Sequence, residues 1–213
     1  IDMSKHQGAH ARMGATDVCP FVPVAGVTME ECVELARRLG ERVGGELGIP
    51  VYLYEAAATR PERRNLAELR QGEYEGLPKK LADPTMAPDF GPAIFNPRSG
   101  ATVIGARQFL IAYNVNLNTR SRALAHDIAI TIRERGRFKR DEGGKIVRDA
   151  EGKKVRQPGT LKATKATGWY IEEYSMAQIS MNLVDSSLTP PHVAFEEVVR
   201  QATERGLRVT GSE

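Results

Sequence analysis

The sequence has few cysteines and no long apolar run. Cys19 and Cys32 are the only cysteines among 213 residues, too few for a disulfide framework or a four-cysteine zinc site. This scarcity favours a reducing, cytoplasmic location. No apolar run approaches the roughly 18 residues that a membrane helix needs, so we expect no membrane association. The 20 glycines and 12 prolines follow no period, which excludes collagen-like and disordered chains.

Several common catalytic and nucleotide-binding motifs are also missing. The sequence contains no phosphate-binding P-loop, no GxGxxG dinucleotide fingerprint and no GxSxG nucleophile elbow. Aromatic residues make up 6% of the chain and do not form the strand pattern of an RNA recognition motif. We therefore expect no nucleic-acid partner. The remaining composition, 41% hydrophobic and 27% charged, is ordinary for a folded globular protein.

The net charge of +3 is unevenly distributed along the chain. Arg133–Lys165 holds twelve Lys or Arg and five Asp or Glu, a balance of +7, so the rest of the chain sums to −4. Lys145–Val147 and Lys154–Arg156 flank a turn at Asp149–Gly152, which predicts a basic β-hairpin. Two interpretations are open, a solvated surface hairpin and a patch that attracts an anionic ligand.

The first half of the chain predicts a strand, a helix and a second strand. Thr16–Val24 and Ile49–Tyr54 are rich in β-branched and aromatic residues. Between them, Thr28 and Glu31 form a capping-box pattern at the start of a helix that ends near Leu47.

A short helix is predicted near Asn65. Leu77–Gly100 then carries five prolines and several apolar residues, which predicts a long packed loop at the border of two domains.

The second half predicts the order βαββαβ, which is the split βαβ unit of ferredoxin-like domains. We therefore predict an α+β protein with two ferredoxin-like subdomains, residues 1–106 and 107–213, the first incomplete at its N-terminus. The predicted elements are strands at Arg107–Leu117, Gly168–Tyr174, Met176–Val184 and Leu207–Thr210, a helix at Thr119–Arg135, and a helix with Thr189 as N-cap and Pro190 as its first residue.

Histidines are the main candidates for chemistry. His6 and His10 are four residues apart, but Gly8 lies between them and no third ligand completes a metal site, so we expect no metal. General acid–base use is the alternative, because histidine titrates near neutral pH. His126 and His192 are interpreted as exposed or structural side chains.

Many short stretches, spread over nearly the whole chain, closely resemble the glutamate formimidoyltransferase family. The resemblance implies that the chain is cut at both ends. The stretches that carry it are Ile1–His6, Ala9–Val24, Val51–Tyr54, Gly72–Leu81, Ala87–Pro92, Gly100–Thr102, Gly105–Ile111, Asn114–Leu117, Gly168–Tyr170 and Gly211–Ser212.

The resemblance implies transfer of a formimino group from N-formimino-L-glutamate to N5 of tetrahydrofolate, a co-substrate. The catalytic histidine of the family falls on His10, in the His-x-Arg-Met-Gly stretch, and Arg12 is a candidate contact for a substrate carboxylate. By analogy the protein could be a homodimer. Formyl transfer from N-formylglutamate, and a non-catalytic folate-binding or nucleic-acid-binding module, remain alternatives. The implied folate loop comprises Gly91, Pro92, Ala93, Ile94, Phe95, Asn96, Pro97, Arg98, Ser99 and Gly100.

Overall fold

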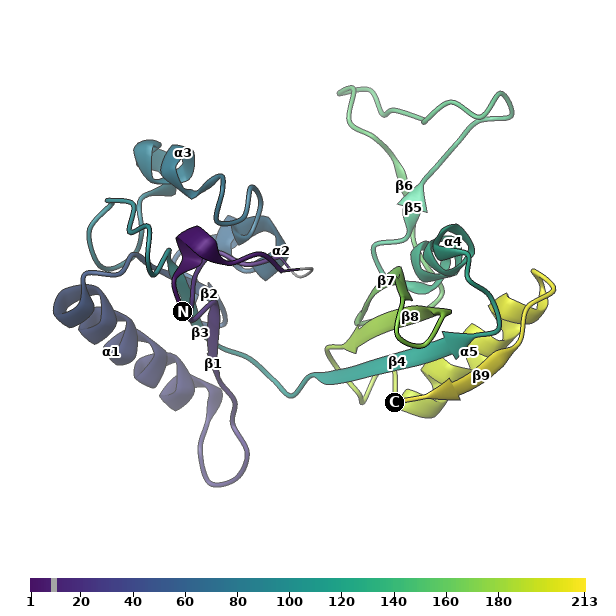
Figure 1. Cartoon of the computed structure of the whole chain (residues 1–213), viewed down its shortest axis with the longest axis horizontal. Helices are drawn as coiled ribbons and strands as arrows, with labels where there is room; N and C mark the ends of the chain where they lie inside the picture. The colour runs from purple at the N-terminus through teal and green to yellow at the C-terminus, as the bar shows by residue number, and fades with distance from the viewer. Residues whose placement is uncertain (9–10) are drawn as a thin grey trace. The chain divides into compact units, whose positions relative to one another are not determined.

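The computed structural model describes residues 1–8 and 11–213. The chain forms two compact units, Ile1–Gln108 and Phe109–Glu213 (Figure 1). The first contains a parallel sheet and the second an antiparallel one, each combined with helices, which confirms the predicted α+β class. Within the described residues, no helix is both long and apolar enough to cross a membrane.

The sheet of the first unit has three parallel strands in the order β1-β3-β2. The ferredoxin-like topology predicted for this unit is therefore wrong for its described strands, because neighbouring strands of that fold are antiparallel. The strands are β1 (Val18–Phe21), β2 (Val51–Glu55) and β3 (Thr102–Ala106). β1 lies inside the strand predicted at Thr16–Val24, and β2 extends one residue beyond the strand predicted at Ile49–Tyr54. β3 was not predicted, although it is the central strand and every one of its residues is buried.

Helix α1 (Met29–Leu47) covers this sheet, and both of its ends follow the prediction. The capping box of Thr28 and Glu31 is present, with both reciprocal hydrogen bonds formed. The buried residues of the helix are small: Cys32, Ala36, Gly40 and Gly44. Small side chains allow neighbouring segments to approach the helix backbone closely.

The prediction of a long loop between two domains at Leu77–Gly100 is wrong in two respects. The segment contains helix α3 (Leu77–Ala82) and the 3-10 helix η3 (Pro84–Met86), and it lies inside the first unit, not at a border. Prolines occupy the first turns of both helices, where a missing backbone N–H leaves no hydrogen bond unmade. Before them come η2 (Pro61–Arg63) and the one-turn helix α2 (Leu66–Leu69), close to the helix predicted near Asn65.

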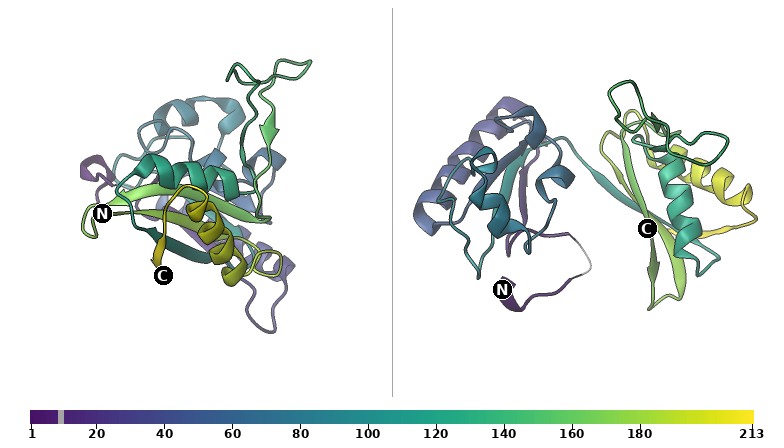
Figure 2. Two further views of the ribbon diagram at one scale, coloured as in Figure 1. Left: turned by 90° about the vertical axis from the view of Figure 1, so that its right-hand side faces the viewer. Right: turned by 90° about the horizontal axis from the view of Figure 1, so that it is seen from above.

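The second unit has the strand order β7-β8-β4-β9 with every neighbouring pair antiparallel, as a split βαβ unit requires. Helices α4 and α5 share one hydrophobic core with the strands and lie on the same side of the sheet (Figure 2). The elements are β4 (Ile111–Leu117), α4 (Arg122–Ile132), β7 (Thr164–Ile171), β8 (Met176–Leu183), α5 (Pro191–Thr203) and β9 (Val209–Ser212).

Several predicted element ends in this unit need correction; β7, for example, runs from Thr164 to Ile171 and not from Gly168 to Tyr174. The strand predicted from Arg107 begins only at β4, and the helix predicted over Thr119–Arg135 is the shorter α4, capped by the Ser121 side chain. Helix α5 begins at Pro191 with Pro190 as its N-cap. Thr189 does not cap it, because its hydroxyl donates a hydrogen bond to the Lys162 carbonyl 2.7 Å away.

The basic segment forms an arm with two tips, not one hairpin (Figure 1). Its stem pairs β5 (Arg137–Phe138) with β6 (Arg156–Gln157). Beyond the stem, two octads follow one another, Arg140–Val147 and Arg148–Val155, and each forms a tight turn. The aspartate at the second position of each octad makes the same hydrogen bond. Asp141 Oδ1 accepts from the Lys145 amide at 2.9 Å, and Asp149 Oδ1 accepts from the Lys153 amide at 2.8 Å.

Three backbone hydrogen bonds join the stem and the two turns at one point. The Val147 amide donates to the Lys139 carbonyl, the Val155 amide to Val147, and the Lys139 amide to Val155, each at 2.9 Å. The predicted turn at Asp149–Gly152 exists. Its flank at Lys145–Val147 belongs instead to the preceding turn, because Arg140 pairs with Ile146 and Arg148 with Lys154.

Candidate active site

The first unit brings together the two stretches in which site residues were predicted. The Ala15 amide donates to the Ser99 carbonyl at 2.9 Å, and the Ala101 amide to the Met13 carbonyl at 3.1 Å. The His-x-Arg-Met-Gly stretch and the end of the predicted folate loop therefore run side by side. His10 itself, the predicted acid–base residue, lies outside the described residues.

Two glycines make this close approach of the two backbones feasible. Gly14 and Gly100 form an antiparallel bridge. A Cβ atom on Gly14 would lie 2.5 Å from the Ser99 carbonyl oxygen, and one on Gly100 would lie 2.8 Å from the Gly14 Cα. Gly100 also has a φ of +68°, which L side chains rarely adopt. Neither position accepts a larger residue without moving the other segment.

Arg12 is held by carboxylates from the segment after α2. Its Nη2 lies 2.7 Å from Glu75 Oε1 and its Nη1 lies 2.9 Å from Glu75 Oε2 and 3.2 Å from Glu73 Oε2. The hydrogen bonds with Glu75 raise the pKa of Arg12 and lower the pKa of Glu75. Both terminal nitrogens are therefore occupied, and the predicted contact with a substrate carboxylate remains a prediction.

Asp17 fixes the same stretch through a second set of bonds. Its Oδ1 accepts a hydrogen bond from the Met13 amide at 2.7 Å, and its Oδ2 forms an ion pair with Arg70. The Met13 side chain is fully buried beside the sheet. The backbone two to four residues beyond His10 is thus anchored by apolar packing and by a charged acceptor.

A buried ion pair sits at the start of the predicted folate loop. Asp89 and Arg63 are 7% and 2% exposed, and Asp89 Oδ2 lies 2.7 Å from Arg63 Nη1. Asp89 also accepts from the Leu53 amide at 2.8 Å and from the Thr59 hydroxyl at 2.5 Å. The carboxylate of the Pro-Asp-Phe-Gly-Pro run therefore has a structural role, tying the loop to β2 and η2.

The next residues press the loop against α1. Gly91 has a φ of +78°, and a Cβ atom there would lie 2.5 Å from the Ile49 carbonyl oxygen. A Cβ atom on Gly44 would likewise lie 2.5 Å from the Gly91 amide nitrogen. The Phe90 side chain packs between Gly40 and Val51 in the core below.

The remainder of the loop is closed on itself by Asn96. Its side-chain oxygen accepts from the amides of Arg98 and Ser99, at 3.1 and 3.0 Å, and its carbonyl accepts from the Gly100 amide at 2.8 Å. The Phe95 ring lies 5.3 Å from the Tyr74 ring. Ile94, in contrast, is 70% exposed. The loop is a fixed turn with an apolar side chain presented at its surface.

Sequence reasoning missed the carboxylates and the arginine that hold the His-x-Arg-Met-Gly stretch. These residues have ordinary charged side chains and belong to no recognised catalytic or binding motif; they are Asp17, Arg70, Glu73 and Glu75. The available signal was that Asp17, Glu73 and Glu75 lie in stretches that carry the family resemblance, Ala9–Val24 and Gly72–Leu81, and had no assigned role.

The other predicted residues are placed as follows. His6, His126 and His192 are exposed, the last two as interpreted. Cys32 is buried, whereas Cys19 is half-buried, and burial raises the pKa of the Cys19 thiol. Among the residues that the structure describes, no group of three or more His, Cys, Asp or Glu could hold a metal ion.

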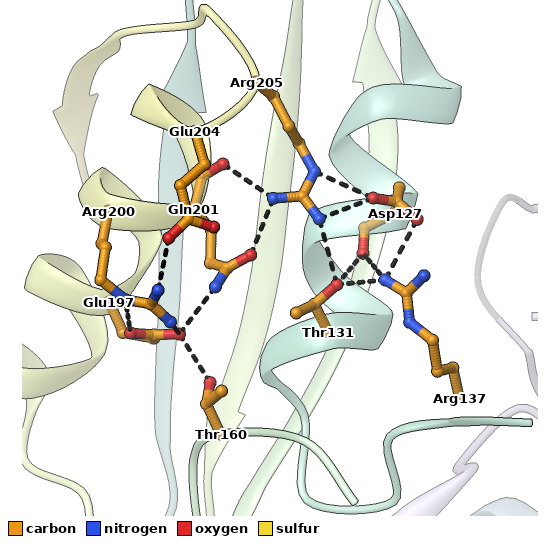
Figure 3. Close-up of polar contacts among 9 residues, drawn as sticks. All are labelled: Asp127, Thr131, Arg137, Thr160, Glu197, Arg200, Gln201, Glu204 and Arg205. Atoms are coloured by element: carbon orange, nitrogen blue, oxygen red, sulfur yellow. Dashed lines mark hydrogen bonds and ion pairs between the residues drawn. The ribbon is translucent and has the colours of Figure 1, made fainter. Parts of the chain in front are cut away.

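The second unit carries a polar network of structural character (Figure 3). Asp127 on α4 lies 2.9 Å from Arg205 Nε and 3.1 Å from Arg137 Nη2. Arg205 also donates a hydrogen bond to the side-chain oxygen of Gln201 on α5, and the Gln201 side-chain nitrogen lies 3.2 Å from Glu197 Oε1. The network ties α4, α5 and the stem of the arm together.

Comparison with known proteins identifies both units. Residues 1–107 match the family model for the formiminotransferase domain, N-terminal subdomain, and residues 112–213 match that for the formiminotransferase domain. All of the chain aligns with a glutamate formimidoyltransferase of Streptococcus pyogenes serotype M1, with 44% identity over 64% of that protein.

The chain also aligns throughout with formimidoyltransferase-cyclodeaminases, at 52% identity for Gallus gallus and 51% for Sus scrofa. It spans 36% of the length of each of these two relatives. Its sequence thus matches formiminotransferase models over both compact units, and the chain belongs to the formiminotransferase domain family.

Proposed function

We propose that this protein transfers the formimino group of N-formimino-L-glutamate to N5 of tetrahydrofolate, giving 5-formiminotetrahydrofolate and L-glutamate. One observation carries the proposal. The stretch that contains the predicted catalytic histidine and the predicted folate loop are about 80 residues apart, yet they are hydrogen-bonded to one another at Met13–Ala15 and Ser99–Ala101. The names of the relatives, glutamate formimidoyltransferase among them, support the same reaction.

The chemistry needs a proton carrier. N5 of tetrahydrofolate attacks the amidine carbon, a C–N bond forms, and the nitrogen becomes positively charged. His10 removes the proton from this charged nitrogen and then delivers it to the departing glutamate nitrogen as the C–N bond to glutamate breaks. An imidazole with an ordinary pKa can perform both steps, for an effect of about 10²–10⁴ on the rate. The sequence of steps requires neither a metal nor a covalent enzyme intermediate.

The rest of the rate enhancement comes from holding both substrates in line. The loop Gly91–Gly100 suits this task because Asp89, Gly91 and Asn96 fix its shape before a ligand arrives. In this proposal Ile94 contributes apolar contact to the folate. Two roles are open to Arg12, contact with a substrate carboxylate, as the sequence predicts, and its pairing with Glu75. A cytoplasmic location and a homodimer belong to the proposal as well.

The test is the variant His10→Ala, assayed with N-formiminoglutamate and N-formylglutamate as alternative donors. We expect transfer from the formimino donor to fall by at least 10²-fold, while tetrahydrofolate affinity stays within about threefold. His6→Ala serves as the matched control and should retain most activity. Turnover by His10→Ala close to that of the parent protein would remove the histidine from the mechanism. A clear preference for the formyl donor would change the assigned substrate.

A further inference from the structure

Two sets of ion pairs cross between the stretch after His10 and the segment after α2. Arg12 in the first stretch binds Glu75 and Glu73 in the second, whereas Arg70 in the second binds Asp17 in the first. Each segment therefore supplies one cation and at least one anion. Such reciprocal pairing fixes the relative position of the two backbones at two points, about five residues apart in each segment.

The Asp17–Arg70 pair is shielded from solvent on both sides, whereas the Arg12 pairs are shielded at the arginine alone, because Glu73 and Glu75 are 44% and 65% exposed. The side chains of Arg12, Asp17 and Arg70 are 13%, 20% and 26% exposed. Arg12 lies 5.9 Å from the centre of the Tyr74 ring, and its Nε is buried with no hydrogen-bond partner among the described residues. Charge-assisted, two-pronged arginine–carboxylate bonds of this kind define a direction as well as a distance.

Each pair also holds backbone that lies near His10 in the sequence. Arg12 Nη2 donates to the His6 carbonyl at 3.3 Å, so this guanidinium joins the backbone four residues before His10 to its own position two residues after it. Asp17 accepts from the Met13 amide at 2.7 Å. On the preceding side, the Met3 amide donates to the Arg98 carbonyl of the folate loop at 3.0 Å.

We infer that Arg12, Asp17, Arg70 and Glu75 are positioning residues that orient His10 for proton transfer. This inference rests on the proposed function, in which His10 carries the proton. It assigns Arg12 to the protein's own carboxylates, and not to a carboxylate of the substrate. The two roles make opposite predictions for the removal of Glu75.

The decisive variant is Glu75→Gln in the otherwise intact protein. If Arg12 orients His10, kcat falls at least tenfold, towards the roughly 10²-fold that a 1 Å misplacement costs, and KM for both substrates stays within twofold. If Arg12 binds a substrate carboxylate, Glu75 competes with it, so its removal lowers KM for that substrate and spares kcat. A lower KM with unchanged kcat would overturn the inference.

The matched control is Glu46→Gln. Glu46 forms a two-pronged pair with Arg42 on α1, at 2.8 and 3.2 Å; both side chains are exposed, and neither residue belongs to the two segments. We expect its kcat to stay within 1.5-fold of the parent. The variants Arg12→Gln and Glu75→Gln, alone and combined, form a double-mutant cycle. If Arg12 and Glu75 act through their mutual ion pair, the double variant should lose no more kcat than the worse of the two single variants. A double variant whose loss in kcat equals the product of the two single losses would contradict this.

A second measurement does not depend on turnover. Hydrogen exchange of the Met13 amide reports directly on the Asp17 bond, and we expect Asp17→Ala to accelerate it at least tenfold. Arg70→Met should accelerate it as well, because Asp17 loses the partner that orients it. Exchange unchanged in both variants would overturn the positioning assignment.

These results separate the inference from the proposed function. An inactive His10→Ala together with a fully active Glu75→Gln would reject the positioning roles and leave the proposed function standing. An active His10→Ala removes the histidine mechanism itself. Where Glu75→Gln does not fold, Glu75→Asp replaces it, and its kcat must lie between those of the parent and Arg12→Gln.

Discussion

Asp89 receives hydrogen bonds from three separate parts of the first unit: the Leu53 amide, the Thr59 hydroxyl and the Arg63 guanidinium. Asp89→Asn removes the charge but keeps the shape, so it leaves Arg63 buried without a counter-ion. We expect a loss of about 3–5 kcal/mol in the free energy of unfolding, measured by urea denaturation. Glu46→Gln breaks an exposed pair and should cost under about 1 kcal/mol. A similar, small loss for both variants would contradict the structural role of Asp89.

Tyr52 gives the first unit a dependence on alkaline pH. Its side chain is fully buried, and its hydroxyl donates to the Met86 carbonyl at 2.9 Å. Burial raises the pKa of Tyr52 from 10.0 to about 12. The folded protein therefore keeps this proton at pH values where the unfolded chain loses it, and stability is lost as the pH rises from about 10 to about 12.

The variant Tyr52→Phe isolates this contribution. Urea denaturation between pH 9 and pH 12 should show a smaller loss of stability for Tyr52→Phe than for the parent protein, because the variant has no phenol to ionise. Parallel curves for the two proteins would show that Tyr52 titrates alike in both states.

Helix α1 places two adjacent glycines in contrasting surroundings. A Cβ atom on Gly45 would meet nothing within 4 Å, whereas one on Gly44 would lie 2.5 Å from the Gly91 amide nitrogen. We expect Gly45→Ala to stabilise the protein by about 0.5–1 kcal/mol, since alanine favours the helix. Gly44→Ala should destabilise it by about 1–3 kcal/mol and, if the proposed function holds, weaken tetrahydrofolate binding, because it pushes the predicted folate loop off the helix. Equal effects in thermal denaturation would disprove this contact.

The elements that the sequence predicts well are those with local signals. The capping box at Thr28 and the apolar spacing that follows it specify α1. Alternating strands and amphipathic helices similarly specify the order of the second unit. Strand β3 carries no such signal, because a short apolar run fits a buried strand and other buried structure equally.

Contacts between distant residues explain most of what was missed at the site. Arg12 and Glu75 are 63 residues apart, and Asp17 and Arg70 are 53 apart. No local pattern indicates such pairing, so a charged side chain in either segment is expected to be solvated. The resemblance alone suffices to propose a folate loop and a catalytic His-x-Arg-Met-Gly stretch, but it does not predict that the two segments are hydrogen-bonded to one another.

At the scale of the whole molecule, the second unit holds a complete core of its own. Its hydrophobic cluster draws buried side chains from β4, β7, β8, α4 and α5, together with Leu161 from the segment before β7. We expect residues 109–213, produced alone, to unfold cooperatively in urea, with strong hydrogen-exchange protection in β4 and β8. Ala129→Asp, a charge placed in that core, is the control that should abolish the transition. A gradual, non-cooperative transition in the unaltered fragment would show that the core depends on the first unit.

The two-tipped arm has a consequence for how this region tolerates changes in length. Because Lys139, Val147 and Val155 bond to one another in a ring, either octad can be removed without breaking the ladder of the stem. Without Arg140–Val147, Lys139 would be followed directly by Arg148, which already pairs with Lys154. Without Arg148–Val155, Val147 would be followed by Arg156, and the pairing of Lys139 with Val147 would continue the stem. The arm is therefore modular, with eight residues as the step by which it can shorten while β5 and β6 keep their register.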